Sequence, residues 1–305
     1  MTGGGGFVGS HLIDKIINTG EFVYCLDNFT TGRHNNINHL LGHKNFKLIE
    51  HDITNPIDLD IDKIWHLACP ASPKYYQKDP IKTTKINFIG TLNMLELASK
   101  KNAHIFLAST SEVYGDPEVS PQDESYKGSV NNIGIRSCYD EGKRVAESLC
   151  FDYKRTYNIN IHVARIFNTY GPRMSPIDGR VISNFIVQAI TNKDITIYGD
   201  GEQTRSFCYV DDLVNGIYKF MYSDFKGPLN LGNPNEITIN QLSAIIRTKI
   251  NKNLKIILKP LPKDDPLKRK PSIELAKKEI DWEPKIDLDD GLNKTIKYFK
   301  KVLSK

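Results

Sequence analysis

The chain begins with four consecutive glycines, residues 3–6, which are followed by Phe7, Val8 and Gly9. Glycine tolerates the positive φ of a tight turn and lets a backbone approach a pyrophosphate closely, and the N-terminus of a following helix attracts phosphates. A flexible glycine-rich terminus is the alternative interpretation. The G-x-x-G-x-x-G spacing favours a phosphate-binding turn and a helix that starts at Phe7.

Apolar, β-rich runs alternate with runs of helical period through the first half of the chain. Strands are expected at 22–26, 46–49, 63–67, 104–108 and 161–164, and helices at 83–100 and 139–157. This alternation predicts an α/β fold with a doubly wound parallel sheet of the Rossmann type. We expect a nucleotide-binding domain at residues 1–170, to which residues near 205–232 also contribute.

The later part of the chain has shorter elements separated by loops rich in Pro, Gly and Asp. Strands are expected at 195–198, 229–231 and 255–258, and helices at 181–191, 210–222, 239–250 and 288–302. We interpret residues 171–305 as a smaller α/β substrate lobe that is interleaved with the first domain.

The strand that should lead into the glycine turn is the central strand of such a sheet, yet only Met1 and Thr2 precede Gly3. The sequence therefore predicts that this first strand is truncated, or that another segment fills its position.

Composition excludes several classes of protein. The 305 residues are 39% hydrophobic, which suffices for a core, and no apolar run approaches the length of a membrane span. The first residues lack a signal peptide, so a soluble, cytoplasmic enzyme is expected. A net charge of +5 without a basic stripe argues against nucleic-acid binding, and five scattered cysteines argue against disulfides or a zinc site.

Two aspartates follow expected strands. Asp27 ends a strand about twenty residues after the glycine turn, where a carboxylate holds the ribose hydroxyls of a dinucleotide and repels a 2′-phosphate. Asp27 therefore favours NAD over NADP. Asp52, after the next strand, is a candidate for the adenine edge, and a solvated turn aspartate is the equal alternative.

Tyr139 and Lys143 are four residues apart at the start of a long amphipathic segment, so a helix places both side chains on one face. An ammonium near a phenol favours the phenolate and is expected to lower its pKa. Such a tyrosine can exchange a proton with a sugar hydroxyl while a nicotinamide takes the hydride. The pair predicts a redox site.

Hydroxyl and carboxylate side chains follow the strand at 104–108, in the run Ser109-Thr110-Ser111-Glu112. Ligands of doubly wound sheets bind at the carboxyl ends of the strands, so these groups are expected to reach the reacting sugar. Arginines in later loops suit a diphosphate, because a guanidinium pairs with two phosphate oxygens at once; exposed arginines are the alternative.

Five blocks of sequence resemble the extended short-chain dehydrogenase/reductase superfamily, and within it the UDP-glucuronic acid decarboxylase family. The blocks are DNFTTGR at 27–33, HLACPASP at 66–73, TSEVYGDP at 110–117, CYDEGKR at 138–144 and RKPSI at 269–273. The likeness extends from Gly3 to the last helix. It implies an NAD-dependent enzyme that acts on a UDP-sugar.

The resemblance also implies residue roles. Tyr139 is the catalytic base, Lys143 its electrostatic partner and a ribose ligand, and Thr110 the hydroxyl helper, while Ser111, Glu112 and Arg269 match positions that the decarboxylases add. The other implied NAD contacts are Gly3, Gly6, Phe7, Val8, Asp27, Asn28, Thr31, Gly32, Asp52, Ile53, Leu67 and Ala68. The implied substrate contacts are Lys85 for the carboxylate, Arg180 and Arg205 for the diphosphate, Tyr198 for the uracil, and Asn168, Arg173, Gln203 and Arg269.

The implied reaction is oxidation of the sugar at C4, loss of the C6 carboxylate as carbon dioxide, and reduction of C4 again. A 4,6-dehydratase carries Asp-Glu after the threonine, whereas this chain has Ser111 and Glu112. A 4-epimerase has little use for Glu112 and Arg269. A non-catalytic nucleotide-binding scaffold is the alternative outside enzymes.

Two further expectations concern neighbouring helices. Ile86 stands where the family shows a small polar residue beside Lys85, near the nicotinamide. The apolar faces of 83–100 and 139–157 suggest a helical homodimer interface, although a buried core would give the same pattern.

Overall fold

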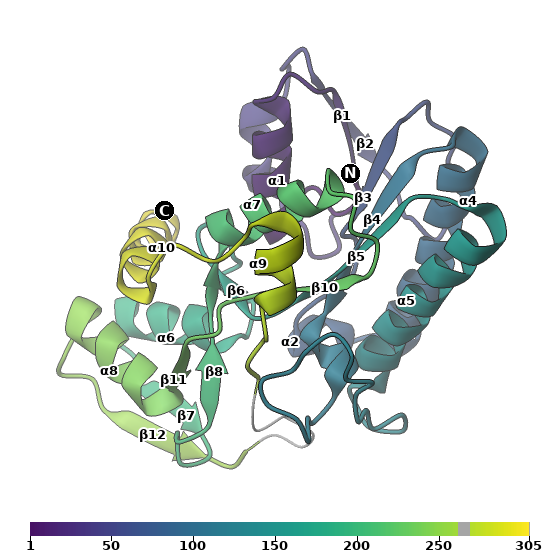
Figure 1. The fold of residues 1–305 in the computed structure, drawn as a ribbon. Helices are drawn as coiled ribbons and strands as arrows, with labels where there is room; N and C mark the ends of the chain where they lie inside the picture. The colour runs from purple at the N-terminus through teal and green to yellow at the C-terminus, as the bar shows by residue number, and fades with distance from the viewer. Residues whose placement is uncertain (262–268, 305) are drawn as a thin grey trace.

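The computed structural model, which describes residues 1–261 and 269–304, is built around parallel strands (Figure 1). They are β1 (Val23–Asp27), β2 (Phe46–Glu50), β3 (Lys63–His66), β4 (His104–Thr110), β5 (Ile161–Ile166) and β10 (Pro228–Leu231). Four of them pair in the order β10-β5-β4-β3, and β1 pairs with β2. Each overlaps its expected range, and the predicted parallel α/β fold is confirmed.

Met1 and Thr2 lie between β1 and β3. Thr2 forms parallel bridges with Leu26 and with His66. The amide of Thr2 donates to the carbonyl of Trp65 at 2.9 Å, and the amide of Leu26 donates to the carbonyl of Met1 at 2.8 Å. At the end of the strands next to the glycine turn, these residues therefore occupy the central position that the sequence left unassigned, and they join β1 to β3.

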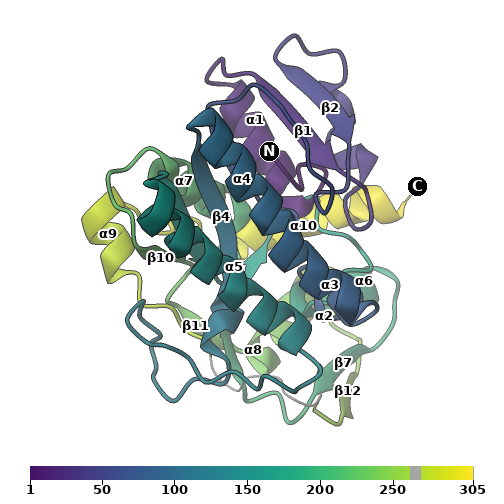
Figure 2. The ribbon, with the colours of Figure 1, turned by 90° about the vertical axis from the view of Figure 1, so that its right-hand side faces the viewer.

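Helices cover both faces of the sheet. Figure 2 shows α4 (Thr91–Lys101) and α5 (Ser137–Tyr157) side by side, and their apolar residues pack on alternate side chains of β3 to β5, among them Ile105 and Val163. On the other face, α1 (Phe7–Ile17) and α7 (Val210–Met221) contact each other and share a core cluster with Phe106. This alternation buries both faces, as a parallel sheet requires.

The helix expected at 83–100 consists of three consecutive segments: α3 (Pro80–Lys85), a π-helical turn (Ile86–Gly90) and α4. Within the widened turn, Asn87 donates its amide to the Thr83 carbonyl at 3.1 Å. A Cβ on Gly142 of α5 would lie 2.7 Å from the Asn87 amide nitrogen, so α5 packs closely on this side chain. A polar side chain inserted between two helices accounts for the π-bulge.

The second part of the chain builds small sheets beside the main one (Figure 1). Their strands are β6 (Thr169–Tyr170) with β9 (Cys208–Tyr209), β7 (Ile195–Tyr198) with β12 (Ile256–Lys259), and β8 (Thr204–Ser206) with β11 (Glu236–Thr238). The helices are α6 (Val181–Ile190), α8 (Ile239–Ile250), α9 (Glu274–Ile280) and α10 (Leu288–Leu303). Because β10 returns to pair with β5, the chain passes between the two parts more than once. The division at residue 170 remains a prediction, and residues 262–268 and 305 lie outside the described ones.

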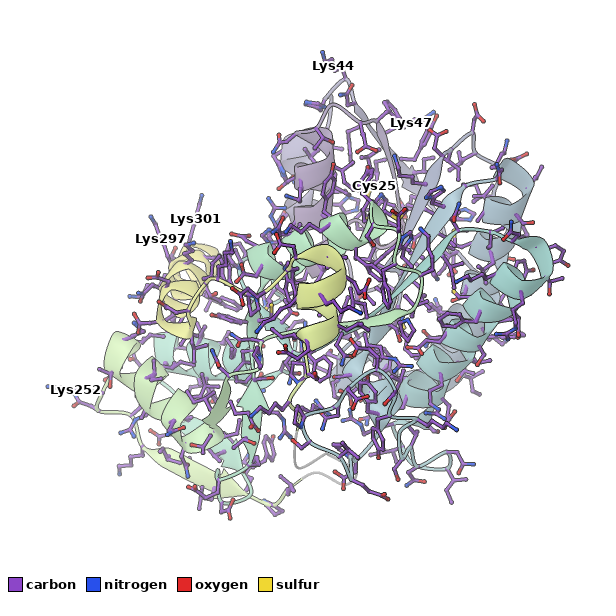
Figure 3. All side chains as sticks on the ribbon, in the orientation of Figure 1. Cys25, Lys44, Lys47, Lys252, Lys297 and Lys301 are labelled. Carbon is purple, nitrogen blue, oxygen red and sulfur yellow. The ribbon has the colours of Figure 1, made fainter. Side chains whose placement is uncertain are left out.

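Short elements complete the fold. They are α2 (Pro73–Tyr76) and the 3-10 turns His34–Asn36, Asn38–Leu40 and Ser111–Tyr114. Lysines such as Lys44, Lys252 and Lys301 project outward, whereas Cys25 lies inside (Figure 3). All five cysteines are free thiols. In residues 1–261 and 269–304, no helix combines the length and apolar character needed to cross a bilayer.

A buried ion pair fixes α5 to the sheet below the cavity described next. Arg165 of β5 and Glu147 of α5 make bidentate contacts, the shortest at 2.8 Å between Nη2 and Oε2, with side chains 13% and 10% exposed. The Ser109 hydroxyl donates to Glu147, and Arg165 donates to the Tyr114 hydroxyl.

Replacement of Glu147 by Ala should lower the free energy of unfolding by about 3–5 kcal/mol, because the buried Arg165 guanidinium loses its counter-charge. The control is Asp152→Ala, which removes an exposed ion pair with Arg155 on the same helix and should change stability by less than about 1 kcal/mol. Chemical denaturation of both variants measures the difference, and equal losses would contradict a structural role for the buried pair.

Candidate active site

A cavity of about 560 Å³ lies at the carboxyl ends of the parallel strands, where the second part of the chain faces the sheet. Most of the predicted site residues line it. From the sheet side these are Gly3, Gly6, Phe7, Val8, Thr31, Leu67, Thr110, Ser111, Glu112, Tyr139 and Lys143. From the loop after β5 and from the second part they are Asn168, Arg173, Arg180, Tyr198, Gln203, Arg205 and Arg269.

The glycine turn is tightly packed. Gly3 has a φ of 70°, and a Cβ there would lie 2.8 Å from the Ala68 amide nitrogen, so only glycine fits without strain. A Cβ on Gly9 would lie 2.2 Å from the Gly3 carbonyl oxygen, whereas one on Gly6 would meet only that oxygen, at 3.0 Å. Gly6 is the N-cap of α1, so the helix begins at Phe7 as predicted and directs its free amides at the cavity.

Asp27 lies at the end of β1, beside the turn. Its carboxylate accepts hydrogen bonds from the amides of Gly5 at 2.9 Å and Phe29 at 2.8 Å, and burial raises the pKa of Asp27. Asp27 does not line the cavity itself, although Thr31 and Arg33 of the same loop do. The nearby Arg33 guanidinium donates to the carbonyls of Arg173 at 2.6 Å and Met174 at 3.1 Å.

Tyr139 is buried in the first turn of α5. Its ring stacks on that of Tyr76 with centroids 4.8 Å apart, and the Thr110 side chain lies near its hydroxyl and acts to lower its pKa. The Lys143 ammonium lies 6.0 Å from the Tyr139 ring centroid and donates to the Ala108 carbonyl at 2.9 Å. The predicted shared face of Tyr139 and Lys143 is therefore present.

The expected lowering of the Tyr139 pKa is not found in the protein alone. Burial raises the pKa of Tyr139 well above its ordinary value. The reason is that removing a phenolate from water is more unfavourable than the nearby Thr110 side chain is favourable, and the Lys143 ammonium is directed at a backbone carbonyl. Tyr139 is thus a neutral phenol in this state.

Glu112 lies at the centre of a buried ionic cluster that includes two arginines and Asp140. It accepts hydrogen bonds from Arg269 at 2.8 Å and from Arg136, and Arg136 lies 3.6 Å from an Asp140 oxygen. The Glu112, Arg136, Asp140 and Arg269 side chains are 9%, 9%, 10% and 13% exposed. The backbone of the loop that carries Arg269 is held by the Ser206 hydroxyl, which donates to the Arg269 carbonyl at 3.1 Å.

Three residues of the site were not expected from the sequence. Arg136 and Tyr76 line the cavity, and Asp140 contacts Arg136 from the first turn of α5. The Tyr76 hydroxyl and one Asp140 oxygen are buried without a hydrogen-bond partner in the described structure. Burial, together with the Glu112 charge, raises the pKa of Asp140 to about 7. The available signal was the i, i+4 spacing of Arg136 and Asp140 around Tyr139.

Arginines and polar groups of the second part line the far end of the cavity. Arg180 is the N-cap residue of α6 and pairs with Asp178 at 3.1 Å between Nη2 and Oδ1. Arg173 pairs with Asp14 of α1 at 2.6 Å, so it also connects this region to the helix that follows the glycine turn. The Gln203 amide donates to the Tyr198 carbonyl at 2.6 Å.

Some predicted residues lie outside the cavity lining. Lys85 is exposed at the end of α3, so the structure does not bring it to the site that the resemblance assigned to the sugar carboxylate. Asp52 accepts hydrogen bonds from Asn28 and Thr54 instead of facing the cavity. Ile86 is buried. The remaining predicted residues that do not line the cavity are Asn28, Gly32, Ile53 and Ala68.

Comparison with known proteins identifies the class. Residues 1–295 match the family described as GDP-mannose 4,6 dehydratase. A UDP-glucose 4-epimerase from Thermotoga maritima has a TM-score of 0.90 and 30% identity, over 99% of this chain and 98% of that one. A UDP-glucuronic acid 4-epimerase from Bacillus cereus, in complex with UDP-glucuronic acid and NAD, has a TM-score of 0.90 and 28% identity, over 99% and 98%. The chain belongs to this family of extended short-chain dehydrogenases/reductases.

Within that family, the chain has high sequence identity to the UDP-glucuronic acid decarboxylases. The chain is 54% identical over 303 residues to UDP-glucuronic acid decarboxylase 1 of Xenopus tropicalis, which covers 99% of this chain and 72% of that protein. It is also 54% identical over 300 residues to UDP-glucuronic acid decarboxylase 1 of Arabidopsis thaliana, covering 98% and 69%. The resemblance predicted from the five sequence blocks is confirmed.

Two glycine variants should separate folding from cofactor binding. Gly9→Ala places a Cβ against the chain's own backbone, so it should lower the melting temperature by several degrees, as expected for about 1–3 kcal/mol. Gly6→Ala places a Cβ 3.0 Å from one backbone oxygen, a tight contact but milder than that of Gly9→Ala, so it should melt closer to the parent temperature but bind NAD at least about tenfold more weakly. Thermal melts measure the stability of each variant, and NAD titrations measure its affinity for the cofactor. Tight NAD binding by Gly6→Ala would contradict the assignment of the glycine turn as the pyrophosphate site.

Proposed function

We propose that this protein decarboxylates UDP-glucuronate to UDP-xylose, with NAD as a recycled cofactor. The observation that carries the proposal is one cavity in which the Tyr139–Thr110 pair lies beside Glu112 and Arg269. The first pair suits proton exchange with a sugar hydroxyl. The second pair provides a guanidinium for a carboxylate and an acidic group near the carbon that loses it.

The residues at the glycine turn fit a dinucleotide. The amides at the start of α1 face the cavity, and the close backbone packing at Gly3 and Gly9 leaves room for a pyrophosphate at Gly6. Asp27 lies beside the turn for the ribose, and Arg33, which a 2′-phosphate would need, is already bonded to two carbonyls. When bound, NAD would accept the hydride from C4 of the sugar and return it.

Tyr139 acts as the base for the 4-hydroxyl of the sugar. Because burial raises the pKa of Tyr139, the phenolate requires help from its neighbours, and the nearby Thr110 side chain acts in that direction. The Lys143 ammonium, 6.0 Å from the centre of the Tyr139 ring, is the positive charge on the same helix face, and we assign it to stabilising the phenolate and holding a ribose hydroxyl. The base is therefore active only once the site is assembled around the substrate.

Decarboxylation follows from the position of the ketone. With a carbonyl at C4, the C6 carboxylate is β to a ketone, so the electrons of the C5–C6 bond can move to the C4 oxygen. The neutral Tyr139 hydroxyl donates to that oxygen and stabilises the enolate. Arg269 holds the carboxylate before it leaves, and C5 is protonated from the Glu112 side of the cavity. The buried Tyr76 hydroxyl is a further donor beside the sugar.

The nucleotide portion of the substrate extends toward the second part of the chain. Arg180 and Arg205 line that end of the cavity and suit the diphosphate, and Tyr198 with Gln203 suits the uracil. The residues that bind the nucleotide are therefore different from those that act on the sugar.

A 4-epimerase is the second candidate, because a solved UDP-glucuronic acid 4-epimerase has the same fold. An epimerase must retain the carboxylate that a decarboxylase expels. The decarboxylase relatives are 54% identical to this chain and the epimerase is 28% identical, which favours decarboxylation. Product analysis separates the two, since only one reaction releases carbon dioxide.

A homodimer through the outer faces of α3 to α5 is also proposed. The inner faces of α4 and α5 are already buried against the sheet, so the apolar pattern of these helices is mainly explained by the core. Ile81 and Phe88 nevertheless remain 71% and 42% exposed near α3, which suits a contact between two copies. Size-exclusion chromatography with light scattering tests this, and a monomeric mass would contradict it.

Tyr139→Phe should lower kcat by at least about a hundredfold while leaving the fold intact, because it removes the group that exchanges a proton with the 4-hydroxyl. The assay is release of carbon dioxide from UDP-glucuronate by NAD-loaded protein without added reductant. Near-normal turnover by this variant would remove Tyr139 from the mechanism.

Arg269→Ala and Arg205→Ala should have different effects, since the first contacts Glu112 and the second faces the proposed diphosphate. Arg269→Ala should slow carbon dioxide release at least about tenfold with little change in UDP affinity, as expected when an interaction specific to the transition state is lost. Arg205→Ala should weaken UDP binding more than it lowers kcat. Decarboxylation at the parent rate by Arg269→Ala would exclude its catalytic role.

A further inference from the structure

Asp140 is a buried carboxyl group for which the mechanism above has no use. It is 7% exposed, one of its oxygens has no hydrogen-bond partner in the described structure, and the other lies 3.6 Å from the Arg136 Nε. A buried carboxyl group that is only half satisfied is unfavourable, so its presence requires an explanation.

Charged and titratable groups reach Asp140 from several elements. Glu112 comes from the turn after β4, Arg136 precedes α5, and Arg269 precedes α9. Tyr76 of α2 and Cys138 of α5 are its uncharged titratable neighbours. Among the residues that the structure describes, the charged groups that act on Asp140 are the guanidiniums of Arg136 and Arg269 and the Glu112 carboxylate, so together with Asp140 the cluster has two guanidiniums and two carboxyl groups.

The net charge of this cluster depends on Asp140. With both carboxyl groups ionised the two positive and two negative charges cancel, so an incoming substrate carboxylate would add an uncompensated negative charge in a buried site. With Asp140 protonated, the cluster carries one positive charge, and the carboxylate neutralises it. Only the protonated form matches an anionic sugar.

Decarboxylation reverses this balance. The C5–C6 bond breaks, carbon dioxide leaves without charge, the electron pair passes to the C4 oxygen, and a proton then forms the new C5–H bond. One proton is consumed in total, and the product has no carboxylate. Without the anion, the protonated cluster again has an excess positive charge, which favours release of a proton from Asp140.

We infer that Asp140 takes up one proton as the substrate carboxylate enters the cluster and gives it up after carbon dioxide has left, which makes it a positioning residue that matches the site to an anionic sugar. This inference rests on the proposed function. Because burial raises the pKa of Asp140, its protonated form is accessible near neutral pH.

The sign of the pH dependence follows from linkage. Above the pKa of Asp140 in the free site, UDP-glucuronate must bring a proton with it, so its affinity should fall by up to about tenfold per pH unit. UDP-xylose lacks the carboxylate, so its affinity should stay nearly constant over the same range. Asp140→Asn mimics the neutral form, and its affinity for UDP-glucuronate should no longer depend on pH there.

The test uses calorimetric titration of NAD-loaded Tyr139→Phe protein, which binds substrate without turning it over, in buffers of different ionisation enthalpy at about pH 8. We expect uptake of about one proton with UDP-glucuronate and none with UDP-xylose. Adding Asp140→Asn should abolish the uptake, whereas adding Asp152→Asn, an exposed residue of the same helix, should preserve it.

Equal proton uptake with both sugars, or uptake that persists in Asp140→Asn, would overturn the inference. If Asp140→Asn does not fold, Asp140→Glu keeps a titratable group there, and proton uptake that differs between the two sugars and shifts in pH with this variant supports the inference. An unshifted uptake overturns it. Failure of UDP-glucuronate to bind, with normal binding of UDP, would contradict the proposed function instead.

Discussion

The ion pair between Glu112 and Arg269 connects two segments that are far apart in the sequence, and the geometry of the site depends on it. Glu112 follows β4 at the edge of the sheet, and Arg269 precedes α9. Their contact brings the segment that precedes α9 onto the part of the cavity that contains Glu112. Because both side chains are about nine-tenths buried, removing either one takes a counter-charge away from the other inside the protein, which is unfavourable.

Sequence alone was sufficient for the parts of the fold that have local signals. The glycine turn, the strands and the Tyr139–Lys143 pair follow from residue spacing, and the structure places them as expected. Lys85 was assigned to the sugar carboxylate, but the structure leaves it exposed outside the cavity lining, because its position depends on how a helix with a π-helical turn packs. Asp140 was overlooked because its i, i+4 spacing from Arg136 also occurs on exposed helices, and the sequence does not show that this pair is buried.

The protonation state of Tyr139 also could not be predicted from the sequence. The spacing of Tyr139 and Lys143 predicts a nearby ammonium, and it is present. Whether a phenol becomes more or less acidic depends on the balance of charge and solvent exclusion, and here burial is the larger effect. A sequence motif identifies the groups, but the cavity around them determines the protonation state.

Arg33 has a consequence for how cofactor preference could change during evolution. Its guanidinium, in the loop after β1, is bonded to the backbone of residues 173 and 174 and to the Tyr298 hydroxyl of α10. An arginine in this loop is also the side chain that a phosphorylated ribose would recruit. If Arg33 turned to a 2′-phosphate, it would give up its bonds to residues 173 and 174 and to Tyr298. A change from NAD to NADP would therefore loosen the connection between the two sides of the cavity.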